Sequence, residues 1–133
     1  MTNENKGTII IADDDGAVLD MYNRFLISAF PDHSIEPFPD GTSLVARLDK
    51  GISVPIVVVT DNEMPGIHGR EIVKEYAHQV PIILAYGGPS DIGEKATEDG
   101  AYVVLKKPTS LSNLASTIEN AFENYSWPRE SSQ

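Results

Sequence analysis

The sequence contains no cysteine, which excludes disulfide bonds, thiolate nucleophiles, zinc–thiolate sites and iron–sulfur clusters. It has no apolar run approaching the roughly 18 residues that a membrane span requires, and its polar start, MTNENKG, is unlike a signal peptide. Basic residues are scarce, with 10 lysines and arginines against 20 aspartates and glutamates, so the net charge is −10. Such a charge repels phosphate backbones and anionic lipids. We therefore expect a soluble, cytoplasmic domain with no nucleic-acid or membrane partner.

What the sequence does contain is a regular alternation of two patterns over 133 residues, 41% of them hydrophobic. Short, continuous apolar runs, typical of strands buried on both faces, each precede a segment with helical periodicity. These runs cover residues 8–12, 34–38, 56–60, 81–85 and 101–105. Pro37 indicates that the second run lies at a sheet edge. The alternation predicts a single-domain α/β fold, a doubly wound parallel sheet of five strands with helices on both faces.

Capping residues mark where the predicted helices start. Asp15 and Asp40 are suited to cap the first two helices, and Ser110 lies where the last one starts. Pro31 ends the first helix, because proline cannot continue its hydrogen-bond ladder. Apolar residues at helical spacing are expected to face the sheet: Val18, Tyr22, Phe25, Leu26, Ala29, Leu44, Val45, Leu48, Ile72, Val73, Tyr76, Leu111, Leu114, Ala115, Ile118, Ala121 and Phe122.

Charged residues follow three of the predicted strands. Asp13 and Asp14 follow the first, Asp61 follows the third, and Lys107 follows the fifth. Functional groups of such sheets gather at the carboxyl ends of the strands. In a sheet of order 2-1-3-4-5 the first and third strands are neighbours, so the carboxylates would converge. Unit charges about 5 Å apart repel by roughly 3 kcal/mol at an effective dielectric of about 20. A lysine and a hard divalent cation would offset this repulsion, and ligands restricted to oxygen indicate Mg²⁺.

Three segments carry a family resemblance through their order and spacing: IIIADDDGAV, VVVTDNEMPGIHG and GAYVVLKKP. The second matches the pattern D-x-x-M-P-G-x-x-G, and the third matches G-A-x-x-x-x-x-K-P. Over residues 7–124 the chain resembles the receiver domains of two-component response regulators, whose flavodoxin-like (CheY-like) sheet has the order 2-1-3-4-5. Residues 1–6 are then expected to be a disordered N-terminus and residues 125–133 a C-terminal tail.

The resemblance implies a signalling phosphoacceptor rather than an enzyme. Asp61 matches the residue that takes a phosphoryl group from a sensor histidine kinase or a phosphotransfer protein. Asp14 matches a direct Mg²⁺ ligand, as does the backbone carbonyl of Glu63, while Asp13 matches an acidic residue that holds the ion through water. Lys107 matches the lysine that pairs with the phosphoryl oxygen, and the peptide bond before Pro108 is expected to be cis. A downstream protein target is implied as well.

Two positions depart from the family pattern. Receivers usually have threonine or serine after the fourth strand, where this chain has Tyr86, whose phenol is too long to take the same place and must either swing out or partly cover the pocket. Gly87 follows it, and its N–H can still serve the phosphoryl group. The aromatic residue usually found three positions before the lysine is replaced by Val104. Phosphorylation is therefore expected together with a non-standard switch.

Three other hypotheses compete with this one. The departures at Tyr86 and Val104 favour a pseudo-receiver, an interaction module that works without phosphorylation. The segment DDDG at 13–16 resembles the start of haloacid-dehalogenase-type phosphatases, with Asp13 as nucleophile, although no acidic pair follows Lys107 at a strand end. A flavodoxin-like FMN binder would share the fold, but the aspartates after the first strand would repel the FMN phosphate.

Overall fold

The computed structural model describes residues 5–53, 55–88 and 91–127, in which strands and helices alternate along the chain. The strands are β1 (Thr8–Ala12), β2 (Ser34–Phe38), β3 (Ile56–Asp61), β4 (Ile82–Tyr86) and β5 (Val103–Lys106). The helices are α1 (Gly16–Ala29), α2 (Gly41–Asp49), α3 (Gly69–Tyr76), α4 (Ile92–Glu98) and α5 (Leu111–Asn124).

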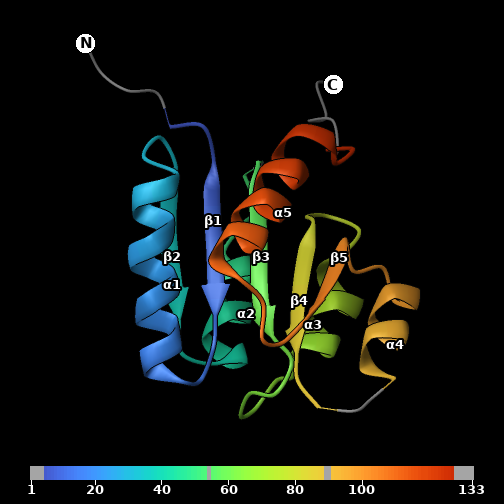
Figure 1. Ribbon diagram of the computed structural model, residues 1–133. Coiled ribbons are helices and arrows are strands. Elements are labelled where there is room, and N and C mark those ends of the chain that lie inside the picture. Colours follow the sequence, from blue (N-terminus) through green and yellow to red (C-terminus); the bar gives the residue numbers. More distant parts are fainter. Residues whose placement is uncertain (1–4, 54, 89–90, 128–133) are drawn as a thin grey trace, which may run out of the picture.

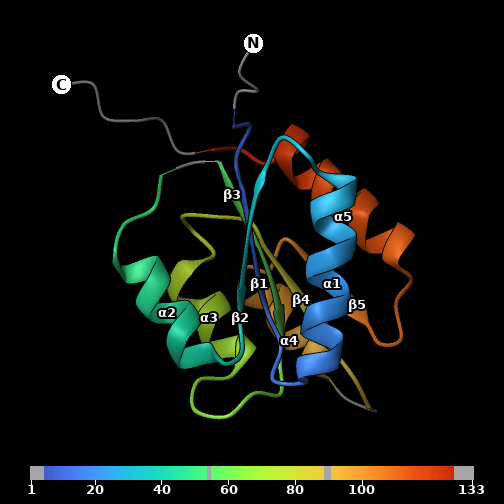
Figure 2. The ribbon, with the colours of Figure 1, turned by 90° about the vertical axis from the view of Figure 1, so that its left-hand side faces the viewer.

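The strands form a parallel sheet in the order β2-β1-β3-β4-β5, which confirms the predicted fold class. Helices cover both faces, with α1 and α5 on one side of the sheet and α2, α3 and α4 on the other (Figures 1 and 2). The strand order switches between β1 and β3, because β2 lies on the outer side of β1 while β4 and β5 follow on the outer side of β3. At such a switch point the carboxyl ends of the two neighbouring strands leave a crevice, which is the usual place for a site in this architecture.

Burial of both sheet faces explains why the strands read as continuous apolar runs. In β1, Ile9 and Ile11 pack with α1 and α5, while Ile10 packs with the helices of the opposite face. Every residue of β3 is buried, including its polar end, Thr60 and Asp61. The crevice is therefore built on the most deeply buried strand of the sheet.

Side-chain caps start the helices where the sequence predicts them. The Asp15 carboxylate accepts hydrogen bonds from the N–H groups of Ala17 and Val18, and Asp40 and Ser110 accept from backbone N–H groups in the same way. Most of the residues expected to face the sheet are buried or half-buried, but Ala29 is exposed. Among the described residues, no helix has the length and apolar character that crossing a membrane demands.

The last two strands begin later in the chain than their apolar runs. β4 begins at Ile82, because Pro81 has no N–H to offer and contributes only its carbonyl, which accepts from Val58. β5 begins at Val103; before it, the N–H of Ala101 donates to the carbonyl of Ala96 at the end of α4, and the first bond to β4 is donated by the N–H of Tyr102 to the carbonyl of Ile82. Both strands extend one residue further than expected, to Tyr86 and Lys106.

At the chain ends, residues 1–4 of the expected disordered segment and residues 128–133 of the expected tail lie outside the described residues. Lys6 is described, and its backbone N–H donates to the carbonyl of Asp32 at 2.8 Å. Trp127 is described as well, and its ring packs against Tyr125 with centroids 4.8 Å apart.

Candidate functional site

Three aspartates converge in the crevice between β1 and β3. Asp61 ends β3 and is 6% exposed, Asp13 directly follows β1 and is 2% exposed, and Asp14 is an exposed residue. Each offers a carboxylate oxygen, and these oxygens all lie within 4.8 Å of one another. The structure thus brings together the carboxylates that the sequence placed at separate strand ends.

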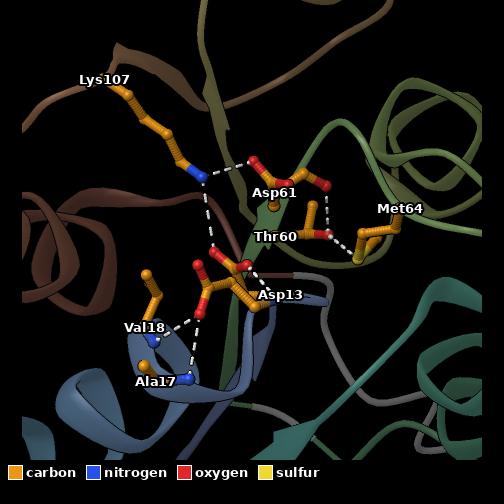
Figure 3. Close-up of polar contacts among 8 residues, drawn as sticks. Asp13, Ala17, Val18, Thr60, Asp61, Met64 and Lys107 are labelled. Carbon is orange, nitrogen blue, oxygen red and sulfur yellow. Dashed lines mark hydrogen bonds and ion pairs between the residues drawn. The ribbon is translucent and has the colours of Figure 1, made fainter.

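Lys107 reaches into this cluster from the segment after β5. Its Nζ lies 2.8 Å from Oδ1 of Asp61 and 3.4 Å from Oδ2 of Asp13, pointing between the two carboxylates (Figure 3). The backbone N–H of Lys107 donates to the carbonyl of Tyr86 at 2.7 Å, which ties the end of β5 to the end of β4. The Lys107–Pro108 peptide bond is cis, as the family resemblance implies.

The electrostatics of the cluster are those of buried, mutually repelling acids partly offset by one cation. Burial raises the pKa of Asp61, the Lys107 ammonium counteracts it, and the charges of Asp13 and Asp14 add to the rise. Burial alone would lower the pKa of Lys107, but its ion pairs with Asp61 and Asp13 outweigh that effect and raise it. One ammonium therefore faces several carboxylates, an arrangement that attracts a further cation.

The loop after β3 is organised by Asn62, a residue that the sequence analysis missed. Its N–H donates to the carbonyl of Ala85, and its carbonyl accepts from Gly69 at 3.0 Å. Its side-chain Oδ1 accepts from the N–H of Arg70, one of the otherwise unpaired donors in the first turn of α3. A polar residue next to a buried strand end was the available signal. These bonds hold the main chain at Asp61 between β4 and α3.

Two close contacts shape the same loop. A Cβ at Gly69 would lie 2.6 Å from the carbonyl oxygen of Asp61 and 2.9 Å from Cα of Asn62, so only glycine permits this approach. On the other side, the Thr60 hydroxyl donates to the Asp61 carbonyl at 3.0 Å and lies 3.9 Å from Sδ of Met64 (Figure 3). Asp61 is therefore held by contacts on two sides of its backbone.

The other predicted site residues lie around this centre. Glu63 is exposed in the loop after β3, and its carboxylate accepts from the side chain of Asn62 at 3.2 Å. Gly87 is exposed just after β4, and no atom lies within 4 Å of the place that a Cβ would take there. Tyr86 is half-buried, and its hydroxyl end lies against Gly93 of α4. Val104 is half-buried and packs with the core beneath that helix.

Comparison with known families gives a match over most of the chain. The family described as "Response regulator receiver domain" matches residues 9–119. Among curated proteins, the transcriptional regulatory protein FixJ of Bradyrhizobium diazoefficiens is 34% identical over 120 residues, which cover 87% of this chain and 57% of FixJ. The DNA-binding transcriptional regulator NtrC of Salmonella typhimurium is 26% identical over 124 residues, which cover 90% of this chain and 26% of NtrC. The chain thus spans only part of these relatives.

Solved structures show the same fold. A response regulator receiver domain protein from Clostridium thermocellum superposes with a TM-score of 0.79 at 23% identity, covering 88% of this chain and 94% of that one. The beryllofluoride-activated receiver domain of NtrC4 superposes with a TM-score of 0.76 at 25% identity, covering 90% of this chain and 98% of that one.

Proposed function

Since the chain belongs to the response regulator receiver domain family, a family of signalling domains, we propose that it is the phosphoacceptor of a two-component phosphorelay. Receiver domains take phosphoryl groups from histidine kinases. In this chain a carboxylate oxygen of Asp61 would attack the phosphorus of a phosphohistidine on a kinase or phosphotransfer protein. A P–O bond forms as the P–N bond breaks, and the histidine leaves with the electron pair of that bond. The observation that carries the proposal is the ion pair between Lys107 and the buried Asp61.

The roles of the side chains follow from their positions. Lys107 keeps a positive charge 2.8 Å from Oδ1 of Asp61, where negative charge gathers during in-line phosphoryl transfer. The packed loop around Asp61 holds the attacking carboxylate in place, so little reorganisation is required at the moment of transfer. The N–H of Gly87, at the end of the neighbouring strand, would donate to a phosphoryl oxygen.

The donor set fits Mg²⁺, because the clustered ligand atoms of Asp13, Asp14 and Asp61 are all carboxylate oxygens. Asp14, Asp61 and the backbone carbonyl of Glu63 would hold the ion directly, and Asp13 would hold it through water. A bound Mg²⁺ would supply the positive charge that offsets the repulsion between the carboxylates and the incoming phosphoryl oxygens.

Phosphotransfer is tested by intact-mass measurement after exposure to acetyl phosphate and Mg²⁺. We expect one added phosphoryl group on the wild type and none on Asp61→Asn. Asp15→Asn is the matched control, because it removes a neighbouring carboxylate while asparagine still caps α1. Equal labelling of Asp61→Asn would contradict the assignment, and labelling at Asp13 would favour phosphatase chemistry instead. An unlabelled wild type would favour a pseudo-receiver.

The two departures from the family pattern lead us to propose a non-standard switch toward a downstream protein target. A ligand shifts a conformational equilibrium only through contacts that differ between the two states. Tyr86, held against Gly93, has no short hydroxyl to bring to the phosphoryl group, and Val104 has no ring to move into vacated space. We therefore expect only local changes on activation, at the loop after β4 and the turn at Lys107.

Amide hydrogen exchange with and without beryllofluoride, a phosphate mimic, tests the switch. Broad protection across β4, α4 and β5 in the wild type would contradict it. Tyr86→Thr restores a short hydroxyl, so it should bind beryllofluoride more tightly than the wild type. The gain should be about tenfold or more, since a hydrogen bond to a charged group contributes roughly 1.5–3 kcal/mol.

A further inference from the structure

A hollow of about 620 Å³ lies between the C-terminal ends of α1 and α5, at the end of the sheet opposite to Asp61. Figure 1 shows this end of α5 beside the start of β1, far from the carboxyl ends of the strands, and Figure 2 shows α1 and α5 along the same face. Four aromatic residues line it, and we call it the aromatic hollow: Phe30, His33, Phe122 and Trp127.

The rings of the aromatic hollow form a continuous wall. His33 lies 4.6 Å from Phe122 and 5.4 Å from Phe30, measured between ring centroids. Trp127 is stacked beyond Phe122 with centroids 6.3 Å apart. Burial lowers the pKa of His33 despite the opposing charge of Asp32, so the imidazole is neutral at pH 7. His33 therefore contributes a ring to the wall without adding a positive charge.

The rim of the aromatic hollow is acidic. Asp32, Glu119 and Glu123 line it, and Lys6 is the one cation among the described lining residues. Lys6 pairs with Asp32 at 3.7 Å. Among the described residues, no ion pair includes Glu119 or Glu123. These two glutamates are exposed and four residues apart on α5, so they share one side of the helix and repel each other. A cation placed between them would relieve that repulsion.

We propose that the aromatic hollow binds an arginine side chain presented by a basic segment of a partner protein. A guanidinium stacks on aromatic faces and donates in a planar fork to carboxylates, so it matches both the rings and the glutamates of this site. A lysine ammonium matches the charge but stacks less well. The net charge of −10 favours a basic partner and disfavours nucleic acids and anionic membranes.

This surface is separate from the phosphorylation site. Its lining comes from the end of α1 and the loop between α1 and β2, from the end of α5 and the segment after it, and from the segments before β1 and β3. It includes none of the residues that surround Asp61. Docking here leaves the crevice at the other end of the sheet open. The domain could therefore be held by one partner while it exchanges phosphoryl groups with another.

Fluorescence of Trp127, the single tryptophan of the chain, reports binding directly. The probe is the blocked peptide acetyl-Gly-Gly-Arg-Gly-Gly-amide, titrated into the full chain at low salt. We expect saturable binding that weakens as salt is added. The same peptide with citrulline, which keeps the shape and loses the charge, should bind about tenfold more weakly, and the lysine peptide should lie between them. Equal binding of the citrulline peptide, or no saturable binding of the arginine peptide, would overturn the proposal.

A matched pair of double variants locates the site. The first double variant combines Glu119→Gln with Glu123→Gln and should weaken arginine-peptide binding about tenfold. The control combines Glu94→Gln with Glu98→Gln, which removes the same charge from exposed positions four apart on α4. The control should leave the affinity for the peptide unchanged. Equal affinities of the two double variants would overturn the assignment. Asp61→Asn should bind the peptide like the wild type, which keeps this result independent of phosphorylation.

Discussion

The phenol of Tyr86 at the end of β4 lies so close to Gly93 in α4 that a Cβ on residue 93 would come within 2.7 Å of the hydroxyl oxygen. Alanine usually stabilises a helix by about 1 kcal/mol relative to glycine. In the wild-type background, Gly93→Ala should not give this stabilisation, because the new methyl group must displace the phenol of Tyr86. In a Tyr86→Thr background the space is free and Gly93→Ala should be stabilising by about 1 kcal/mol.

Denaturant unfolding of the four proteins in this double-mutant cycle measures the coupling between the two positions. Equal effects of Gly93→Ala in both backgrounds would mean that Tyr86 does not rest on α4 in solution. The contact would then offer no route by which a change at the end of β4 reaches that helix.

Removing the cation of the site should expose the repulsion among its acids. Lys107→Met leaves Asp61 and Asp13 buried without a counterion, and we expect a loss of about 2 kcal/mol in unfolding free energy without Mg²⁺. This value lies below that of a fully buried pair, because the Lys107 side chain is 31% exposed. Lys106→Met is the control, because it makes the same substitution at an exposed neighbouring lysine. Its free energy of unfolding should stay within about 0.5 kcal/mol of the wild-type value. Similar losses in the two variants would contradict the role of the ion pair.

Adding Mg²⁺ should stabilise the folded chain, because the unfolded chain does not bring the three carboxylates together. The gain follows RT ln(1 + [Mg²⁺]/Kd), about 1.4 kcal/mol at ten times the dissociation constant. Asp14→Asn should weaken this effect while leaving the metal-free protein as stable or more so, because it removes one of the repelling charges. Melting temperatures with and without Mg²⁺ provide the measurement. A wild-type melting temperature that does not change when Mg²⁺ is added would argue against a metal site here.

The close approach of α3 to the end of β3 explains why residue 69 is a glycine, and this can be tested by substitution. Gly69→Ala would place a methyl group 2.6 Å from the Asp61 carbonyl, so we expect a loss of about 2 kcal/mol. Gly16→Ala is the control, since no atom lies within 4 Å of its added Cβ and alanine favours the helix there. Thermal unfolding distinguishes the two. Equal stabilities would mean that the loop after β3 adjusts freely around Asp61.

A hydrogen bond between α2 and α3 predicts a pH dependence of stability. The Tyr76 hydroxyl donates to the Asp49 carboxylate. Burial, together with this bond and the charge of Asp49, raises the pKa of Tyr76 to about 12. Because the folded-state pKa exceeds the ordinary value near 10, the contribution is fully present below about pH 10 and is lost as the pH rises toward 12.

Tyr76→Phe should therefore cost about 1.5 kcal/mol at neutral pH and progressively less above pH 10. Urea unfolding at several pH values measures the difference. Asp49→Asn keeps an acceptor oxygen but removes the charge, so it should return the phenol titration toward its ordinary range. A cost of Tyr76→Phe that stays constant up to pH 12 would contradict this account.

The fold and the centre of the site could be predicted because each depends on a local pattern. β1 and β2 have the bounds that their apolar runs suggest, and Asp13 and Asp61 converge because parallel strands share one carboxyl edge. The bounds of the last two strands and the role of Asn62 depend instead on tertiary contacts. The positions of β4 and β5 depend on hydrogen bonds that apolar character does not specify. The place of Asn62 beside a buried strand end marks it as a polar residue of interest, but its bonding partners on β4 and at α3 are set by the tertiary structure.

Pro37, at the outer edge of the sheet, bears on how the molecule meets its own copies. Among the strands of the described residues, β2 pairs with β1 alone, and the N–H of Ser34 and the carbonyl of Phe38 both bond toward β1. Because successive residues of a strand alternate in direction, Pro37 faces the open side. A neighbouring molecule that tried to extend the sheet would find no N–H donor at that position. Pro37 therefore protects the domain from strand-by-strand aggregation, a hazard of any exposed sheet edge at high concentration.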